Sequence, residues 1–231
     1  MQCLILAGGL GTRMRSVSDS VPKNLLPLAG KPFAVHQLEL LVKNGIDHIV
    51  YSIGHYGDQI REVLGNGSKW KAHIDYVDEG PELRGTGGAV RLAYDTGVLE
   101  DTFFVLYGDS YLPIDYRAPW DVFAKRNELA LMTVFRNEGR FDTSNARFEN
   151  GKVFYDKKAG LAGKGGFEFI DYGLSIFRKP AIERIPTGTK YDLADLAHAL
   201  SLENQLAGFE VTERFYEIGS PSGLKELEAL L

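Results

Sequence analysis

Short apolar segments alternate with amphipathic segments over the first 107 residues, and this alternation constrains the fold more than any other feature of the sequence. The apolar segments have the length and composition of buried strands, and they cover residues 2–7, 47–53, 73–77 and 103–107. The amphipathic segments have helical spacing, and they cover residues 32–43, 58–65 and 87–97. Strands and helices in this order predict a parallel sheet with helices on both faces.

The second half of the chain has a more mixed pattern. Strands are predicted at 129–135 and 172–177, helices at 192–202 and 221–231, and a hairpin at 146–156 with Asn150-Gly151 at its turn. The glycine-rich segment 159–166 is predicted to be a mobile loop. We therefore expect one domain over residues 1–231, of class α/β. It is Rossmann-like, with three α/β/α layers and a mixed, mainly parallel central sheet, and the hairpin-bearing second half covers one sheet edge.

Composition excludes several classes of protein. The net charge of −5 provides no general basic field for nucleic acid. Cys3, the one cysteine, lies in an apolar segment, where a buried small side chain is expected. The sequence has no apolar run near the ~18 residues of a membrane span, and its start lacks the features of a signal peptide. We expect a cytoplasmic protein that binds neither nucleic acid nor membranes.

A glycine-rich, positively charged loop follows the first strand. Gly8, Gly9 and Gly11 let the backbone approach a ligand closely, and Arg13 and Arg15 supply guanidinium groups suited to phosphate oxygens. Ligands of open parallel sheets bind beyond the carboxyl ends of the strands, where this loop begins. The P-loop motif is absent from this loop. The dinucleotide motif G-x-G-x-x-G is only half present, because Met14 occupies its third glycine position.

Several motifs together resemble the sugar-1-phosphate nucleotidylyltransferases. They occur in the family's order, and they are LILAGGLGTRM (4–14), VPKNLLPLAGKP (21–32), LRGTGGAV (83–90), YGDSYL (107–112), FENGKVFYDKK (148–158), IDYGLSIF (170–177) and FYEIGSPSGL (215–224). The resemblance implies the nucleotide-diphospho-sugar transferase fold. It also implies the reaction of a nucleoside triphosphate with a sugar 1-phosphate to give a nucleotide sugar and pyrophosphate, with Mg²⁺ as cofactor.

The resemblance also implies roles for individual residues. Arg13, Lys23 and Asp109 are the expected catalytic residues, and Asp109 and Glu217 the expected metal ligands. The expected nucleotide-binding residues are Leu6, Ala7, Gly8, Gly9, Gly11, Thr12, Arg13, Glu79, Gly85, Thr86 and Gly88. The expected sugar-phosphate-binding residues are Asn145, Asp156, Lys157, Asp171, Tyr172 and Gly173, with Lys158 as an alternative to Lys157. Residues 1–115 form the expected nucleotide-binding half and 116–231 the sugar-phosphate-binding half.

Two positions depart from the family pattern. Asn24 replaces the second proline of a P-K-P motif, from which we expect a less rigid loop, and Glu217 replaces an aspartate. These departures motivate an alternative, a catalytically inactive nucleotide-sugar sensor.

The identity of the substrates stays open at this point. Only carboxylates are available near the expected base site, and a carboxylate accepts hydrogen bonds, which suits the N–H groups of guanine; Glu79 is the leading reader. GTP with a heptose 1-phosphate, for a lipopolysaccharide or capsule precursor, is our first expectation. Uridylyl or cytidylyl transfer to another sugar 1-phosphate, including N-acetylmuramate 1-phosphate, or to phosphocholine is the alternative. The protein is expected to be a monomer or a homodimer.

Overall fold

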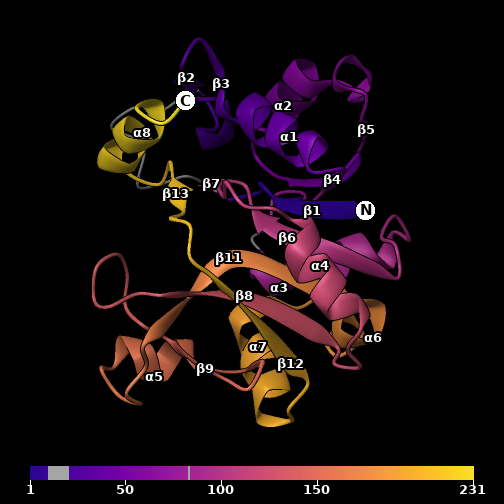
Figure 1. Ribbon diagram of the computed structural model, residues 1–231. Coiled ribbons are helices and arrows are strands. Elements are labelled where there is room, and N and C mark those ends of the chain that lie inside the picture. The colour runs from indigo at the N-terminus through magenta and orange to yellow at the C-terminus, as the bar shows by residue number, and fades with distance from the viewer. Residues whose placement is uncertain (10–20, 83) are drawn as a thin grey trace.

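The computed structural model describes residues 1–9, 21–82 and 84–231, and its centre is a nine-stranded mixed sheet (Figure 1). From one edge to the other, the strands are β5 (His73–Asp78), β4 (His48–Ile53), β1 (Gln2–Leu6), β6 (Thr102–Tyr107), β11 (Phe169–Arg178), β8 (Ala130–Arg136), β12 (Leu206–Val211), β10 (Lys152–Tyr155) and β9 (Ala146–Glu149). Strands β5, β4, β1 and β6 are parallel, as are β8 and β12. The predicted mixed, mainly parallel sheet is confirmed.

Helices cover both faces of this sheet, so the three-layer prediction is also confirmed. They are α1 (Phe33–Lys43), α2 (Gly57–Leu64), α3 (Gly85–Asp95), α4 (Arg117–Ala124), α5 (Lys157–Leu161), α6 (Lys179–Ile182), α7 (Leu193–Leu202) and α8 (Pro221–Glu228). Within residues 1–9, 21–82 and 84–231, each helix is too short or too polar to cross a bilayer.

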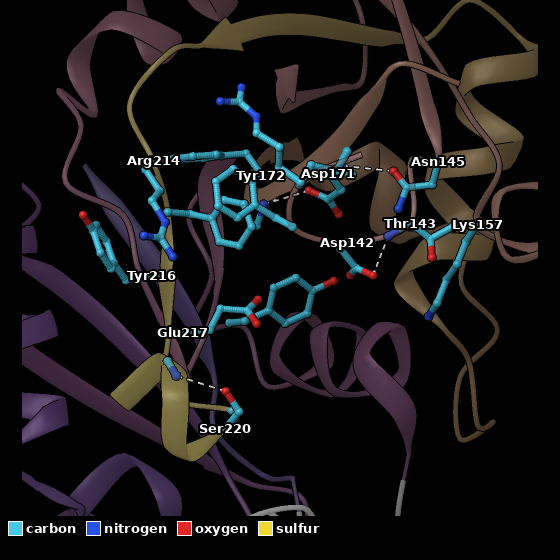
Figure 2. Close-up of a pocket in the computed structure, with 18 of the residues that line it drawn as sticks. Asp142, Thr143, Asn145, Lys157, Asp171, Tyr172, Arg214, Tyr216, Glu217 and Ser220 are labelled. Carbon is cyan, nitrogen blue, oxygen red and sulfur yellow. Dashed lines mark hydrogen bonds between the residues drawn. The ribbon is translucent and has the colours of Figure 1, made fainter. Parts of the chain in front are cut away.

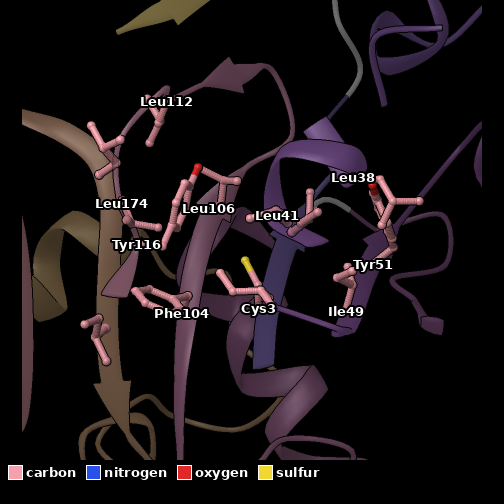
Figure 3. Close-up of a cluster of buried hydrophobic side chains, with 14 of the residues drawn as sticks. Cys3, Leu38, Leu41, Ile49, Tyr51, Phe104, Leu106, Leu112, Tyr116 and Leu174 are labelled. Atoms are coloured by element: carbon pink, nitrogen blue, oxygen red, sulfur yellow. The ribbon is translucent and has the colours of Figure 1, made fainter. Parts of the chain in front are cut away.

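Successive residues of β1 point to the two opposite faces and enter two different apolar clusters. Cys3 packs with side chains of α1, α2 and α4, among them Leu38 and Leu41 (Figure 3). Leu4 packs on the other face, with side chains of α3, α6 and α7. Cys3 is fully buried, as predicted, and burial raises the pKa of its thiol. The thiol is thus an inert part of the core.

Turn residues set the limits of two elements as the sequence predicts. Helix α1 starts after Pro32 and ends at Asn44-Gly45, where Gly45 has a φ of +77° that favours glycine. At the β9–β10 turn, Asn150 and Gly151 have φ values of +52° and +73°. Two successive positive φ angles are required by the tight turn that joins twisted hairpin strands. The predicted hairpin is confirmed, and it forms one edge of the sheet.

Three parts of the second half differ from the sequence-based predictions. The predicted loop 159–166 is wrong in its first part, because helix α5 extends to Leu161 with the Asp156 side chain as its N-cap. Helix α4, which contains Pro119, and strand β12 were not predicted. Strand β12 lies inside the sheet, between β8 and β10, and its apolar segment is too short to be distinguished from a helix by periodicity.

The C-terminal segment returns to the first half of the molecule. Strand β13 (Tyr216–Glu217) pairs with β7 (Ser110–Tyr111), which follows β6 directly. Ile218 and Leu227 of this segment pack against Leu28 and Phe33, close to the ribbon of β2 (Pro27–Leu28) and β3 (Lys31–Pro32). Figure 1 shows α8 beside that ribbon. Two one-turn helices, η2 (Lys23–Leu25) and η3 (Ser68–Trp70), complete the fold. This return brings Glu217 to the carboxyl end of β6.

Candidate active site

A cavity of about 440 Å³ lies at the carboxyl ends of β1 and β6. Seven of the expected nucleotide-binding residues line it, and they are Leu6, Ala7, Gly8, Gly9, Glu79, Gly85 and Thr86. Lys23 and Asp109 line the same cavity. Gly11, Thr12 and Arg13 lie outside the described residues. The strand ends therefore bring together residues that are far apart in the sequence, as expected for an open parallel sheet.

The three glycines of LRGTGG, of which Gly85 and Gly88 were predicted to bind the nucleotide, pack closely against the segment around Tyr191. The backbone N–H groups of Gly87 and Gly88 both donate to the carbonyl oxygen of Tyr191, at 2.9 and 3.2 Å. A Cβ on Gly88 would come within 2.9 Å of the carbonyl oxygen of Thr189. Gly88 is buried there and does not line the cavity, so the structure gives no support to its predicted contact with the nucleotide, which stays a prediction. Gly85 and Thr86 keep their places on the lining.

Glu79 occupies a buried position next to the glycine loop. Its side chain accepts a hydrogen bond of 2.8 Å from Ser52 Oγ at the end of β4. A Cβ on Gly8 would lie 2.6 Å from Glu79 Cδ, so a larger residue at position 8 would displace the Glu79 carboxylate from this place. Burial raises the pKa of the Glu79 carboxyl, while the Ser52 hydroxyl acts in the opposite direction. The carboxylate is thus held by neighbouring elements on the wall of the nucleotide cavity.

Lys23 and Asp109 form an ion pair at the mouth of the cavity. Lys23 Nζ donates to Asp109 Oδ2 at 2.5 Å. The next residue, Asn24, is buried and donates from Nδ2 to the carbonyl oxygen of Gly108 at 2.6 Å. This hydrogen bond ties the η2 turn to the end of β6, which a second proline could not do. The contact does not support the expectation of a looser loop.

Asp109 and Glu217 converge although more than a hundred residues separate them. Ser110 and Glu217 are register partners in the β7–β13 ribbon, and the Ile218 N–H donates to the Asp109 carbonyl at 3.0 Å. The position of a Cβ on Gly219 lies 3.7 Å from Asp109 Oδ2 and 4.0 Å from Glu217 Oε2. Two carboxylates around one space beside a phosphate cavity form the hard oxygen donor set that Mg²⁺ prefers. These residues fit the expected ion.

A second cavity of about 580 Å³ (Figure 2) adjoins the first, and all of its lining residues except Tyr107 come from the second half of the chain. Five of the expected sugar-phosphate-binding residues line it, and they are Asn145, Lys157, Asp171, Tyr172 and Gly173. Tyr107 lines both cavities, and Glu217 projects into the second. Desolvation raises the pKa of Tyr107 far above its ordinary value, so its hydroxyl stays a hydrogen-bond donor at the junction.

Asp171 has the most perturbed carboxyl of this cavity. Its Oδ1 accepts from the Gly173 N–H at 2.9 Å, and its own N–H donates to Asn145 Oδ1 at 3.1 Å. Desolvation raises the pKa of Asp171 to about 6, although the Gly173 N–H and the Lys157 ammonium both favour the charged form. Perturbed carboxyls in a cleft are typical of functional sites.

The structure distinguishes the two neighbouring lysines. Lys157 lines the cavity and donates to Asp192 Oδ2 at 2.8 Å, whereas Lys158 pairs with Asp195 and its side chain is 83% exposed. Asp156 does not line the cavity, because its carboxylate accepts from the Ala159 N–H as the cap of α5. The predicted sugar contact of Asp156 therefore has no support in this geometry, and of the two lysines it is Lys157 that lines the cavity.

Asp192, which was not predicted, links a lining residue of one cavity to a lining residue of the other. Its carboxylate accepts from Thr86 Oγ1 at 3.1 Å on the nucleotide side and from Lys157 on the sugar side. Although burial acts against it, the hydrogen bond with Lys157 holds the pKa of Asp192 below its ordinary value. The sequence offers one signal for this residue, since Asp192 precedes an amphipathic helix as an N-cap.

Further charged residues on the lining also escaped the sequence analysis. Arg84 and Lys190 line the nucleotide cavity, and Arg140, Asp142 and Arg214 line the second cavity. With Lys23, three cationic side chains line the first cavity among the residues that the structure describes, which is the charge that a phosphate-rich ligand would require.

Comparison with known proteins decides the family. The family model described as nucleotidyl transferase matches residues 2–144. The chain belongs to the nucleotidyl transferase family. The resemblance to sugar-1-phosphate nucleotidylyltransferases inferred from the motifs is thereby confirmed.

Two relatives match nearly end to end. A D-glycero-alpha-D-manno-heptose 1-phosphate guanylyltransferase of Aneurinibacillus thermoaerophilus is 30% identical over 237 residues, which is 99% of this chain and 97% of the relative. An N-acetylmuramate alpha-1-phosphate uridylyltransferase of Neisseria meningitidis is 28% identical, covering 100% of this chain and 98% of the relative.

Other relatives are longer than this chain. It spans 53% of the length of a UTP–glucose-1-phosphate uridylyltransferase of Synechocystis, to which it is 27% identical over 205 residues. Among solved structures, a putative glucose-1-phosphate thymidylyltransferase of Bacillus anthracis superimposes with a TM-score of 0.83 and 22% identity, covering 100% of this chain and 94% of that one. The nucleotidyltransferase fold is therefore shared.

Proposed function

We propose that this protein is a sugar-1-phosphate nucleotidylyltransferase. An oxygen of the sugar phosphate attacks the α-phosphorus of a nucleoside triphosphate, the bond from that phosphorus to the β-phosphate oxygen breaks, and pyrophosphate leaves. The observation that carries the proposal is the junction of two cavities at Tyr107, with Lys23, Asp109 and Glu217 at the same place. A transfer between two substrates requires two adjoining sites with the charged groups between them.

The residues of the junction would act mainly by position and charge. Phosphoryl transfer asks for little covalent chemistry from a protein, and charge neutralisation supplies most of the rate. Lys23 would donate to the phosphates that meet at the junction. Arg13 would bind the β- and γ-phosphates and stabilise the departing pyrophosphate. Asp109 and Glu217 would hold Mg²⁺, which when bound neutralises phosphate charge. Lys157, oriented by Asp192, would hold the phosphate of the sugar substrate.

For the base, we propose guanine. Glu79 is buried on the wall of the nucleotide cavity, and its carboxylate accepts hydrogen bonds. Guanine presents two N–H donor groups on one edge, which a carboxylate can accept together. The guanylyltransferase among the end-to-end relatives supports this choice.

For the sugar, a heptose 1-phosphate is our first candidate. Asp171 and Asn145 offer acceptors for the many hydroxyl groups of such a sugar, and the heptose-specific relative spans nearly the whole chain. A second candidate is N-acetylmuramate 1-phosphate, the substrate named for the Neisseria relative. Arg140 and Arg214 on the same cavity wall favour it, because that sugar carries a carboxylate.

A substrate matrix tests the proposal. The protein, with Mg²⁺, is incubated with each of GTP, UTP, CTP, dTTP and ATP against heptose, mannose, glucose and N-acetylmuramate 1-phosphates and phosphocholine, and the nucleotide product is identified by mass. GDP-heptose as the dominant product is the expected result. A UDP or CDP product would move the assignment to those bases. Nucleotide binding without any product would favour the inactive sensor.

A further inference from the structure

A cluster of histidine and carboxylate side chains lies at the opposite end of the sheet from the candidate active site. His48 and His73 begin β4 and β5 and are register partners in this parallel pair. Asp75 follows His73 by two residues, and alternate residues of a strand point to the same face. Figure 1 shows β4 and β5 together at one edge of the sheet. The cluster is therefore built on regular strands, away from both cavities.

The distances within this cluster approach those of a metal centre. Asp75 Oδ2 lies 3.0 Å from His48 Nε2 and 3.2 Å from His73 Nε2. One ligand atom from each of the three residues lies within 4.8 Å of the other two. A tetrahedral ion with bonds of about 2.0 Å to nitrogen and oxygen separates its ligands by about 3.3 Å. Two of the three separations already match, and the third, between the two histidine nitrogens, is no more than 4.8 Å and would have to shorten when the ion binds.

A second layer of contacts orients His48. Its Nδ1 lies 3.3 Å from Glu100 Oε1, and the Glu100 N–H donates to the Oε1 of buried Gln2 at 2.7 Å. Gln2 Nε2 donates to the Val98 carbonyl. It also lies 3.2 and 3.3 Å from the two ring nitrogens of His48, so this contact does not favour either tautomer of the imidazole. With Zn²⁺ on Nε2, the Glu100 carboxylate would hold the remaining ring proton on Nδ1; without the ion, Asp75 Oδ2, 3.0 Å from Nε2, competes for that proton. Metal-binding histidines show this arrangement.

We propose that His48, His73 and Asp75 form a site for Zn²⁺, with Glu100 as a positioning residue for His48. Two imidazole nitrogens with one carboxylate oxygen suit Zn²⁺, whereas the all-oxygen pair Asp109 and Glu217 suits Mg²⁺. Three protein ligands leave a fourth position for water. The ion would link the edge strand β5 to β4 and so stabilise the sheet edge where β5 has one neighbour. The proposal does not depend on the activity proposed above.

The test measures Zn²⁺ affinity on untagged, metal-free protein by competition with a chromophoric chelator, in excess Mg²⁺ to occupy the carboxylates of the active site. We expect one Zn²⁺ per chain. Removing one ligand, in His73→Ala or Asp75→Asn, should weaken binding by more than about 100-fold, and Glu100→Gln by about 10- to 100-fold. The control is His55→Ala, which removes an exposed histidine outside the cluster. Co²⁺ bound to the wild type should show the intense visible absorption of tetrahedral coordination, and the His73→Ala protein should lack it.

Two results would overturn the proposal. The first is wild-type protein that leaves all Zn²⁺ with the chelator. The second is equal affinity in the wild type, His73→Ala and Asp75→Asn, which would make the cluster a hydrogen-bonded network alone. His73 is exposed, so its replacement by alanine leaves the packing of the core intact.

Discussion

Lys23 Nζ lies 2.5 Å from Asp109 Oδ2, across a separation of 86 residues in the chain. Two hydrogen bonds position the backbone on either side of this pair. Asn24 Nδ2 donates to the Gly108 carbonyl, and the Ile218 N–H donates to the Asp109 carbonyl. Each charged group therefore has a fixed place on the lining of the first cavity. In the reaction proposed above, a phosphate that binds Lys23 would share or replace Asp109 as its partner, which would free that carboxylate for the proposed metal ion.

Replacing Asp109 should remove activity without unfolding the protein. In Asp109→Ala, Lys23 loses its partner and the proposed Mg²⁺ loses a ligand, so we expect turnover to fall by at least about 100-fold. Circular dichroism should be unchanged, because the side chain lies at a strand end and is partly exposed. Asp101→Ala is the control, since that carboxylate is 96% exposed at the start of β6. Wild-type turnover in Asp109→Ala would contradict the proposal that Asp109 is a ligand of Mg²⁺.

The neighbouring lysines of α5 provide a matched pair of variants. Lys157→Ala should raise the KM for the sugar phosphate by about 10-fold or more, because a hydrogen bond to a charged group contributes about 1.5–3 kcal/mol. Lys158→Ala should change it less than about twofold, because exposed ion pairs contribute little. Initial rates at varied sugar phosphate measure both. The reverse order of effects would assign the role to Lys158.

Glu79→Gln tests the reading of the base. Glutamine can still accept from Ser52, so the fold should persist, but its amide replaces one acceptor oxygen by a donor. We expect the ratio of kcat/KM for GTP to that for UTP to fall by about 10- to 100-fold, as a mismatched hydrogen bond predicts. The two nucleotides are compared in one competition assay. An unchanged ratio would show that backbone groups or other residues select the base.

Asp171 should make folding stability depend on pH. Its pKa is raised by desolvation to about 6 in the folded protein, against about 3.9 for a free aspartate. The folded state therefore holds the proton more tightly, and this stabilisation is complete below about pH 4 and lost as the pH rises through about 6. Relative to Asp171→Asn, the wild type should lose about 1–3 kcal/mol between pH 4 and pH 7. Urea unfolding of both proteins at these two pH values measures the difference. If the free energy of unfolding changes equally in the two proteins between pH 4 and pH 7, the raised pKa of Asp171 is contradicted.

Much of the fold could be predicted because its signals are local. The apolar run at β1 and the helical spacing of α1 identify their elements within a few turns of chain, and Asn150-Gly151 identifies its hairpin. The β7–β13 ribbon has no such signal, since each strand has two residues and their pairing joins distant segments. The family resemblance predicted Asp109 and Glu217 together as metal ligands, but the ribbon that brings their segments together is visible only in the folded chain.

The candidate site divides in the same way. Asp109 was predicted because it follows a strand at its carboxyl end, where ligands of open sheets bind, whereas Glu79 was predicted from the family resemblance and the chemistry of its carboxylate. Both line the first cavity. Asp156 was assigned to the sugar because a cap and a ligand look alike in sequence, and the structure shows the cap. Asp192 was not predicted as a site residue because its position before a helix indicates only a cap. The structure shows that this cap also accepts hydrogen bonds from Thr86 and Lys157.

The central claim is that two substrates react across the junction between the cavities. The most direct test is pyrophosphate release with Mg²⁺, measured with GTP alone, with heptose 1-phosphate alone and with both together. We predict release only with both substrates, and its loss in Lys23→Ala. Equal release with and without the sugar phosphate, or none with any pair of nucleotide and phosphorylated acceptor, would contradict the account.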